Sequence, residues 1–315
     1  MKINPFAAVA ALACLLLTAC GSSSATEAGS LPQTVVFSVP SLQVEAMKQM
    51  ATGVEALVEP KGWKVVAQDG NMDGQQQAQQ LSVVVASGTA GALWIIALSP
   101  PSLTQVLRDA QAKGIPVVTN GAPKDYGFDG PQPGITFSTI DYGKYGQNAG
   151  TALGTCITEK LGGEAAVVWG KPVAGAAGKE EMEKAQLAAL QAAAPKARIV
   201  SEVASSTLQA AQTDVGNALQ GHPDVNAVMA SVDEVALGSI SAFASAGKDL
   251  PCAVSNGGGE QARAAVRAGK LYATVALQFQ DDVSQCFDAL LAMRSDPRKV
   301  GDQLYVPQQV VRTDG

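Results

Sequence analysis

Apolar and polar residues follow two alternating patterns along this chain. Short apolar runs such as 34–39 and 92–98 are typical of strands buried on both faces of a sheet. Between them, segment 44–58 repeats apolar residues, among them Met47 and Met50, at the spacing of one helix face. The pattern therefore predicts strands that alternate with amphipathic helices.

This alternation occurs twice. The first series is strand 34–39, helix 44–58, strand 63–67, helix 73–86, strand 92–98, helix 102–113 and strand 114–119. The second is helix 141–160, strand 165–169, helix 178–194, strand 198–204, helix 208–220, strand 227–231, helix 233–246, strand 253–256, helix 260–268 and strand 273–277. Such alternation predicts doubly wound parallel sheets, and a chain of 315 residues is long enough for two lobes. We expect an α/β protein with two Rossmann-like lobes.

The first 20 residues follow a different pattern. Lys2 supplies a positive charge, and residues 6–17 form an apolar run that is too short to span a bilayer as a helix. The sequence Leu-Thr-Ala-Cys at 17–20, followed by Gly21, resembles the bacterial lipobox, in which the peptide is cut before the cysteine and the thiol is acylated. The alternative is an ordinary signal peptide with an incidental cysteine.

The lipobox resemblance implies three segments and a cellular location. We expect residues 1–19 to be a lipoprotein signal peptide, Cys20 to carry a lipid anchor, and residues 20–30 to form a flexible tether. No apolar run near 18 residues follows residue 20. The remainder is thus expected at the cell envelope, held by its lipid on the extracytoplasmic face of the membrane.

Charge and cysteine content narrow the function classes. The formal net charge is −6, and an acidic protein is a poor partner for nucleic acid. The globular part contains Cys156, Cys252 and Cys286, and an oxidising compartment permits one disulfide among them. We favour Cys156 with Cys252, and three buried free thiols remain the alternative.

Enzyme signatures are missing from the sequence. Its only histidine, His222, lies in a Gly-His-Pro-Asp turn, and there is no Cys-x-x-Cys motif or Gly-x-Ser-x-Gly elbow. The glycines at 257–259 lack the Lys-Ser/Thr of a phosphate-binding P-loop. We therefore predict no enzymatic activity, no metal and no cofactor.

Four motifs carry a family resemblance. They are KGIPVV at 113–118, HPDVNAV at 222–228, DEVALG at 233–238 and GKLYATV at 269–275. In this order and at this spacing they resemble the sugar-type periplasmic binding proteins, of which the ribose-binding protein is the familiar example. The likeness covers about residues 34–311 and places Asp233 to cap the helix that it begins.

The resemblance implies an architecture and a function. Three crossings between lobes would fall near residues 139–140, 278 and 304. The N-terminal lobe would comprise 31–139 plus 279–303, and the C-terminal lobe 140–278 plus 304–315. Such a protein, expected to be a monomer, captures a small molecule between its lobes and delivers it to an ABC-type permease. A receptor that presents its ligand to a membrane signalling partner is the alternative, and an enzyme on the same fold a more distant one.

The candidate binding residues follow from the rule that ligands of such sheets lie beyond the carboxyl ends of the strands. They replace residues that sugar binders of the family usually carry there: Asn and aromatics near 43–47, an Asp-Arg pair after Thr119, and an aromatic-Asp pair at 256–257. The predicted ligand-binding residues are Gln43, Met47, Asn120, Trp169, Lys179, Val232, Asn256 and Gln278. Trp94 could be a further apolar wall or a core residue.

These replacements bear on the expected ligand. A buried hydroxyl without a hydrogen-bond partner costs about 1 to 3 kcal/mol, so a sugar needs many partners. This chain offers mainly amides and apolar walls at those positions. We therefore expect a small ligand that is less polar than a simple pentose or hexose.

Overall fold

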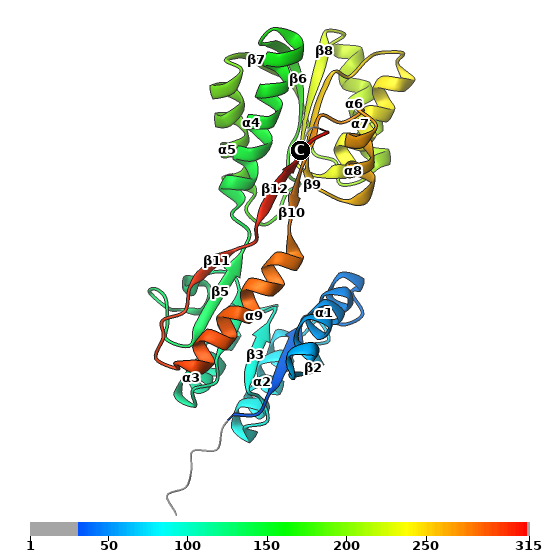
Figure 1. Cartoon of the computed structure of the whole chain (residues 1–315). Coiled ribbons are helices and arrows are strands. Elements are labelled where there is room, and N and C mark those ends of the chain that lie inside the picture. The colour runs from blue at the N-terminus through cyan, green and yellow to red at the C-terminus, as the bar shows by residue number, and fades with distance from the viewer. Residues whose placement is uncertain (1–30, 314–315) are drawn as a thin grey trace, which may run out of the picture. The chain divides into compact units, whose positions relative to one another are not determined.

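The computed structural model describes residues 31–313 of the chain (Figure 1). The expected signal peptide, the expected tether and the expected lipid anchor at Cys20 all lie outside the described residues. Among residues 31–313, the structure has no helix that is both long and apolar enough to cross a membrane.

The first of two sheets has the strand order β11-β5-β4-β3-β1-β2, and all its neighbouring strands are parallel. Its strands are β1 (Thr34–Val39), β2 (Lys64–Asp69), β3 (Ala92–Ile95), β4 (Val117–Asn120), β5 (Ile135–Thr139) and β11 (Gln303–Tyr305). Its helices are α1 (Glu45–Val58), α2 (Gly74–Ser87), α3 (Thr104–Ala112) and α9 (Phe279–Ser295), with 3₁₀ turns η1 (Glu59–Lys61), η2 (Pro100–Leu103) and η3 (Pro123–Tyr126). We call this part the N-terminal lobe.

The second sheet has the order β12-β10-β9-β8-β6-β7, and only β12 is antiparallel to its neighbour. Its strands are β6 (Glu164–Gly170), β7 (Lys196–Val203), β8 (Val225–Ala230), β9 (Cys252–Gly257), β10 (Ala273–Leu277) and β12 (Gln308–Val311). Its helices are α4 (Tyr142–Leu161), α5 (Lys179–Ala193), α6 (Leu208–Gly221), α7 (Asp233–Ser245) and α8 (Glu260–Arg267). This part is the C-terminal lobe, and the predicted α/β architecture with two doubly wound sheets is confirmed.

The core of the N-terminal lobe lies between the first sheet and helices α1 and α9. Phe37 of β1 and Trp94 of β3 are buried and meet edge to face, with ring centroids 5.9 Å apart. Val54 of α1 and Phe287 of α9 belong to the same buried cluster. The continuous apolar runs of the sequence arise because parallel strands are covered on both faces.

Helices α4 and α5 of the C-terminal lobe pack unusually closely. Glycines recur every four residues along one face of α4, at Gly146, Gly150 and Gly154. A Cβ atom built on Gly146 would lie 2.3 Å from the carbonyl oxygen of Met182, and one on Gly150 equally close to that of Gln186. Side chains at these positions would therefore force the two helices apart.

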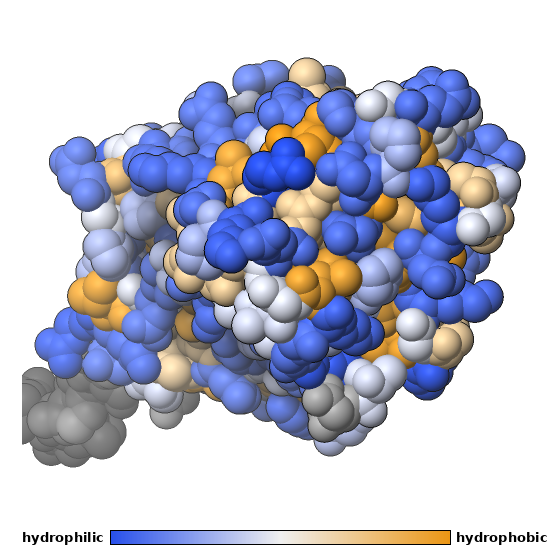
Figure 2. Space-filling view, turned by 90° about the horizontal axis from the view of Figure 1, so that it is seen from above, coloured by the Kyte–Doolittle hydropathy of each residue, from blue (hydrophilic) through white to orange (hydrophobic). Residues whose placement is uncertain are grey.

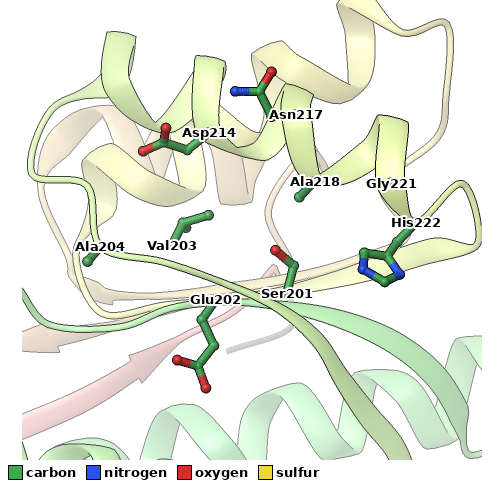
Figure 3. Close-up of a pocket in the computed structure, with 9 residues that line it drawn as sticks. All are labelled: Ser201, Glu202, Val203, Ala204, Asp214, Asn217, Ala218, Gly221 and His222. Atoms are coloured by element: carbon green, nitrogen blue, oxygen red, sulfur yellow. The ribbon is translucent and has the colours of Figure 1, made fainter.

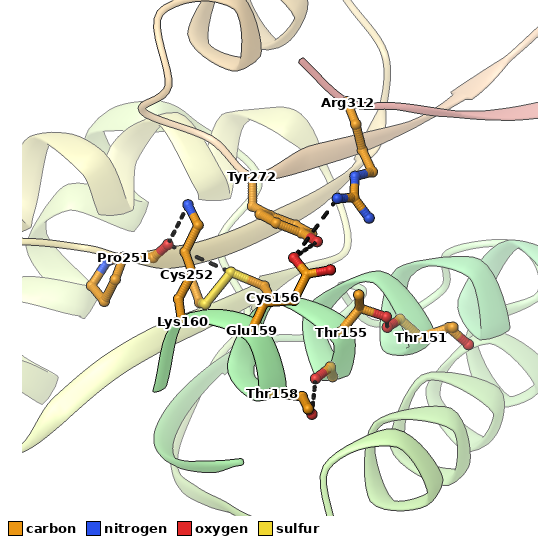
Figure 4. The surroundings of a disulfide bond; sticks show 11 residues. Thr151, Thr155, Cys156, Thr158, Glu159, Lys160, Pro251, Cys252, Tyr272 and Arg312 are labelled. Carbon is orange, nitrogen blue, oxygen red and sulfur yellow. Dashed lines mark hydrogen bonds and ion pairs between the residues drawn. A yellow bond between two sulfur atoms is a disulfide. The ribbon is translucent and has the colours of Figure 1, made fainter. Parts of the chain in front are cut away.

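A disulfide joins Cys156 of α4 to Cys252 of β9, with a Cα–Cα distance of 5.7 Å (Figure 4). This is the pair that the sequence analysis favoured, and Cys286 is free and buried. Beside the disulfide, the Tyr272 hydroxyl donates a 2.6 Å hydrogen bond to Glu159. The guanidinium of Arg312 lies 4.6 Å from the centre of the Tyr272 ring, so the end of the chain packs beside the bridged elements.

Three chain segments cross between the two sheets. The first follows β5, the second lies at Gln278 between β10 and α9, and the third joins β11 to β12. The third crossing begins after Tyr305, because Leu304 and Tyr305 both continue the pairing with β5. The segments also bond to one another: the Gln308 amide donates to the Asp141 carbonyl at 3.0 Å.

Most of the surface visible in Figure 2 is hydrophilic, and hydrophobic residues appear there only in small groups. This distribution agrees with the charged and amide-rich composition of the helices. Helix α2, for example, carries Gln75 and Gln76 in its first turn, and the carboxylate of its cap Asp73 accepts hydrogen bonds from their backbone N–H groups.

Candidate ligand-binding site

A cavity of about 370 Å³ lies at the carboxyl ends of β3, β4 and β5, where the fold predicts a ligand. Residues from α1, α9 and the crossings complete its wall, together with Tyr142 of α4 and Ala177 just before α5 in the C-terminal lobe. The lining residues are Met50, Trp94, Ile96, Val118, Thr119, Asn120, Gly121, Ser138, Thr139, Ile140, Tyr142, Ala177, Phe279, Asp282, Val283, Cys286 and Val306. The lining is largely apolar, and Asp282 is its one ionisable carboxylate.

Asn120, at the end of β4, is held in place by its neighbours. Its side-chain oxygen accepts a 2.7 Å hydrogen bond from the backbone N–H of Ala97. Its backbone carbonyl accepts a 2.9 Å bond from the hydroxyl of Tyr126, which also bonds Thr119 at 2.6 Å. Burial raises the pKa of Tyr126, so this hydroxyl stays protonated. The predicted binding residue Asn120 therefore borders the cavity in a fixed orientation.

Asp282, in the first turn of α9, is the main polar group that the sequence analysis missed. One of its carboxylate oxygens accepts a 2.7 Å hydrogen bond from Ser138 and a 2.8 Å bond from Gln285. The Cys286 thiol lies 3.7 Å from the same oxygen. Burial, with a smaller contribution from the Asp282 charge, raises the pKa of Cys286 and keeps the thiol neutral.

The two candidates on or before α1 lie away from this cavity. Gln43 is exposed, and its backbone N–H donates to the Ser41 hydroxyl at 3.1 Å. Met47 is half-buried and packs against the N-terminal core, where it lines a separate groove with α9. Trp94 is a core residue that also borders the cavity, so both of its expected roles apply.

At the corresponding edge of the second sheet, two predicted binding residues belong to a buried hydrogen-bond chain. The Trp169 indole donates to Gln186 at 3.0 Å, and Gln186 donates to the side-chain oxygen of Asn256 at 3.1 Å. Asn256 in turn donates to the backbone carbonyl of Tyr145 at 3.0 Å. Because buried polar groups need partners, these contacts tie β6 and β9 to helices α4 and α5. Trp169 and Asn256 are core residues here and do not line the cavity.

Asp233 also has a role other than the expected one. Val232 occupies the cap position of α7, and Asp233 begins the helix without a capping contact. Its carboxylate instead accepts hydrogen bonds from the hydroxyls of Ser255 and Thr274 and from the backbone N–H of Gly259. It therefore connects α7 to β9 and β10.

Gly257 explains why the C-terminal lobe lacks a carboxylate that the resemblance would place there. Its φ of +146° is a conformation that side chains rarely adopt, and a Cβ built on it would lie 2.3 Å from a carboxylate oxygen of Asp233. No larger residue fits without a shift of Asp233. The local geometry of this lobe thus fits a glycine and not a carboxylate at position 257.

The remaining candidates are separate from one another. Lys179 forms an ion pair with Glu183, one turn further along α5. Val232 is partly exposed. The Gln278 side chain donates to Gln309 at 3.1 Å within the crossing segments. None of these three lines the cavity, so the structure does not bring the predicted residues together at one site, and their binding roles stay predictions.

A second depression lies between the edge strand β7 and α6, and it contains His222 (Figure 3). Glu202 points to the other side of the strand and pairs with Lys171 at 2.6 Å. Asp214 accepts a 2.6 Å hydrogen bond from Ser205. The acidic groups are thus engaged elsewhere, and within residues 31–313 the structure contains no cluster of His, Cys, Asp and Glu suited to a metal ion.

The fold and site agree with comparisons to known proteins. The family model described as "Periplasmic binding protein domain" matches residues 35–296. The chain belongs to the periplasmic binding proteins, and within them to the ribose-binding-like proteins of the type I fold. It is accordingly a solute-binding protein and not an enzyme.

Particular relatives support this assignment. The ribose import binding protein RbsB of Bacillus subtilis (strain 168) is 30% identical over 274 residues, covering 85% of both chains. The protein of the same name from Haemophilus influenzae is 27% identical over 266 residues, covering 84% of this chain and 85% of the relative.

Solved structures share the fold. An ABC transporter periplasmic solute-binding protein from Actinobacillus succinogenes with bound D-allose has a TM-score of 0.69 at 18% identity, covering 90% of this chain and 98% of its own. A periplasmic ribose ABC transporter protein from Conexibacter woesei has a TM-score of 0.67 at 22% identity, covering 90% and 93%. At these identities the likeness concerns the fold alone.

Proposed function

We propose that this chain is the solute-binding component of an ABC-type importer and that its ligand is a sugar derivative with fewer free hydroxyls than ribose. The import-binding names of the relatives support the transport role and a sugar-related ligand. The cavity beside β3, β4 and β5 supplies the ligand site.

The observation that carries the ligand proposal is the uneven distribution of polar groups around the cavity. Asn120, Ser138 and Asp282 offer amide, hydroxyl and carboxylate groups, whereas apolar side chains such as Met50 and Val283 form much of the wall. Hydroxyls directed at apolar walls would lose their water partners without replacement. A deoxy or alkylated sugar, with one polar and one apolar side, fits such a lining better than free ribose.

We further propose that the chain is anchored through lipidated Cys20 on the extracytoplasmic face of the membrane. The motif Leu-Thr-Ala-Cys at 17–20 supports this location. A Cys20→Ala chain is expected to lose palmitate incorporation and to leave the membrane fraction in cells. Retention of labelled lipid by the variant would contradict the anchor.

Ligand binding can be tested on the chain without residues 1–19 and with Cys20→Ser. We expect thermal unfolding to shift upward with methylated or deoxy pentoses, since a ligand at 100 times its Kd adds about 2.7 kcal/mol of stability. A larger shift with free ribose would contradict the proposed ligand class. Loss of uptake in a deletion strain would support transport, and loss only of a ligand-induced response would favour the receptor alternative.

A further inference from the structure

A second hollow adjoins the candidate site. It is a groove of about 740 Å³ between α1 and α9, which lie side by side in the N-terminal lobe (Figure 1). Met50, Phe279 and Val283 line both the groove and the ligand cavity. The two hollows therefore adjoin, with these three side chains between them.

The groove is apolar and uncharged along its described lining. Helix α1 contributes Met47, Gly53 and Leu57, and α9 contributes Gln280 and Ser284. No Lys, Arg, Asp or Glu is among the lining residues of the described chain. Methionine side chains adapt to ligands of varied shape. The described lining thus suits an uncharged hydrocarbon group and offers no opposite charge to an ionised one.

Two features keep the groove open. Phe279, the first residue of α9, leaves 48% of its surface exposed, although large apolar side chains are normally more stable when buried. Gly53 lies within α1, where glycine is a poor helix former. A Cβ built on Gly53 would have no atom within 4 Å. A larger residue would fit there, so the protein leaves accessible a space that its own side chains could fill.

We propose that this groove holds an apolar substituent, alkyl or aryl, of the ligand whose sugar part lies in the adjoining cavity. The inference rests on the proposed function and names the ligand class more closely, as a glycoside or alkylated sugar with a hydrocarbon group. The three side chains shared by both linings, Met50, Phe279 and Val283, are the argument for a small-molecule group, because a ligand in the cavity lies directly beside the groove. Each methylene buried in the groove should raise affinity about fourfold.

The test compares three probes that share one sugar: D-ribose, methyl β-D-riboside and hexyl β-D-riboside. Isothermal titration uses the chain without residues 1–19 and with Cys20→Ser. We expect the hexyl riboside to bind at least tenfold tighter than the methyl riboside. Gly53→Leu should fill the groove and abolish this difference while leaving the affinity for the methyl riboside unchanged.

The control is Gly216→Leu, because Gly216 lies within helix α6 and likewise has no atom within 4 Å of a built Cβ. It should leave every affinity unchanged. Ser284→Leu narrows the groove from the α9 side and should act like Gly53→Leu, so the test does not depend on the folding of one variant.

The outcomes separate this inference from the proposed function. Two results would overturn the groove inference: equal affinity for the methyl and hexyl ribosides, or a hexyl advantage that survives both Gly53→Leu and Ser284→Leu. Either result would leave a protein partner as the occupant of the groove. Binding of the methyl riboside would then still support the proposed function. No binding by any of the three probes would contradict the proposed ligand class and this inference together.

Discussion

The carboxyl ends of the two sheets carry similar polar residues but use them differently. In the N-terminal lobe, Asn120 and Asp282 are held by neighbours and still border a cavity. In the C-terminal lobe, Asn256 and Asp233 bond to adjacent helices and strands and connect the elements of the lobe. A polar residue at a strand end is therefore available to a ligand only where the fold leaves it facing open space.

Removing the disulfide should produce the largest effect and confine it to the C-terminal lobe. Cys156 and Cys252 are 96 residues apart, and closing a loop of that length is worth about 4.7 kcal/mol of unfolded-state entropy. The double variant Cys156→Ala/Cys252→Ala should lower the stability of this lobe by roughly that amount in urea. Trp169 reports on the C-terminal lobe, and Trp63 and Trp94 on the other.

The separate tryptophan signals also provide the control for the disulfide prediction. Variants that retain either Trp169 alone or the N-terminal tryptophans alone would resolve the two transitions. An equal shift of both transitions would show that the lobes unfold as one unit and would contradict a local effect.

Gln186→Leu should break the buried chain that occupies the C-terminal strand ends. The change leaves the Trp169 indole without its acceptor and Asn256 without a donor, at a cost of about 2 to 4 kcal/mol. Gln191→Leu, on the exposed side of the same helix, should cost less than about 1 kcal/mol. Urea unfolding compares the two, and equal costs would contradict a structural role for the chain.

Asp282→Asn tests the N-terminal site directly. The substitution removes the negative charge of the carboxylate that accepts a hydrogen bond from Ser138. We expect ligand affinity to fall about tenfold, equivalent to about 1.4 kcal/mol. The neighbouring exposed residue Asp281 gives the control Asp281→Asn, which should leave affinity unchanged. Titration with the best-binding sugar derivative measures both. A tenfold loss in the control alone would place the ligand elsewhere.

The Cys286 thiol gives the smallest predicted effect, a dependence of stability on pH. Its pKa is raised in the folded protein, so the unfolded chain releases the proton first as pH increases. The stabilising contribution of the Cys286 thiol should therefore be fully present below about pH 8.5, the pKa of the unfolded thiol. Above that pH, the free energy of unfolding should fall by about 1.4 kcal/mol per pH unit. Urea titrations from pH 7.5 to 9.5 measure the slope, and Cys286→Ala should flatten it.

Periodicity was sufficient to predict the α/β fold because most strands are continuous apolar runs between amphipathic helices. It missed β5 (Ile135–Thr139), in which polar residues alternate with Ile135 and Phe137. It also extended strand 92–98 beyond Ile95, where the backbone instead bonds to side chains: the N–H of Ala97 donates to Asn120. Contacts with residues distant in the sequence determine where these strands form and end, and a local sequence pattern carries no information about such contacts.

The site was less predictable for the same reason. Asn120 ends strand β4 and does border the cavity, whereas Trp169 and Asn256 lie equally near the ends of β6 and β9 and are buried among helices. The difference depends on Gln186, which lies on another element and reaches both. Asp282 is in a helix that follows a crossing, and only the pair of acidic residues at 281–282 beside Gln278 hinted at it.

A crystal structure of the chain with its best-binding sugar derivative tests the central claim most directly. The account predicts the sugar in the cavity between Asn120 and Asp282, with its apolar substituent passing Phe279 into the groove between α1 and α9. A ligand bound only to the C-terminal lobe, with Asn256 released from Gln186 to hold it, would contradict the account.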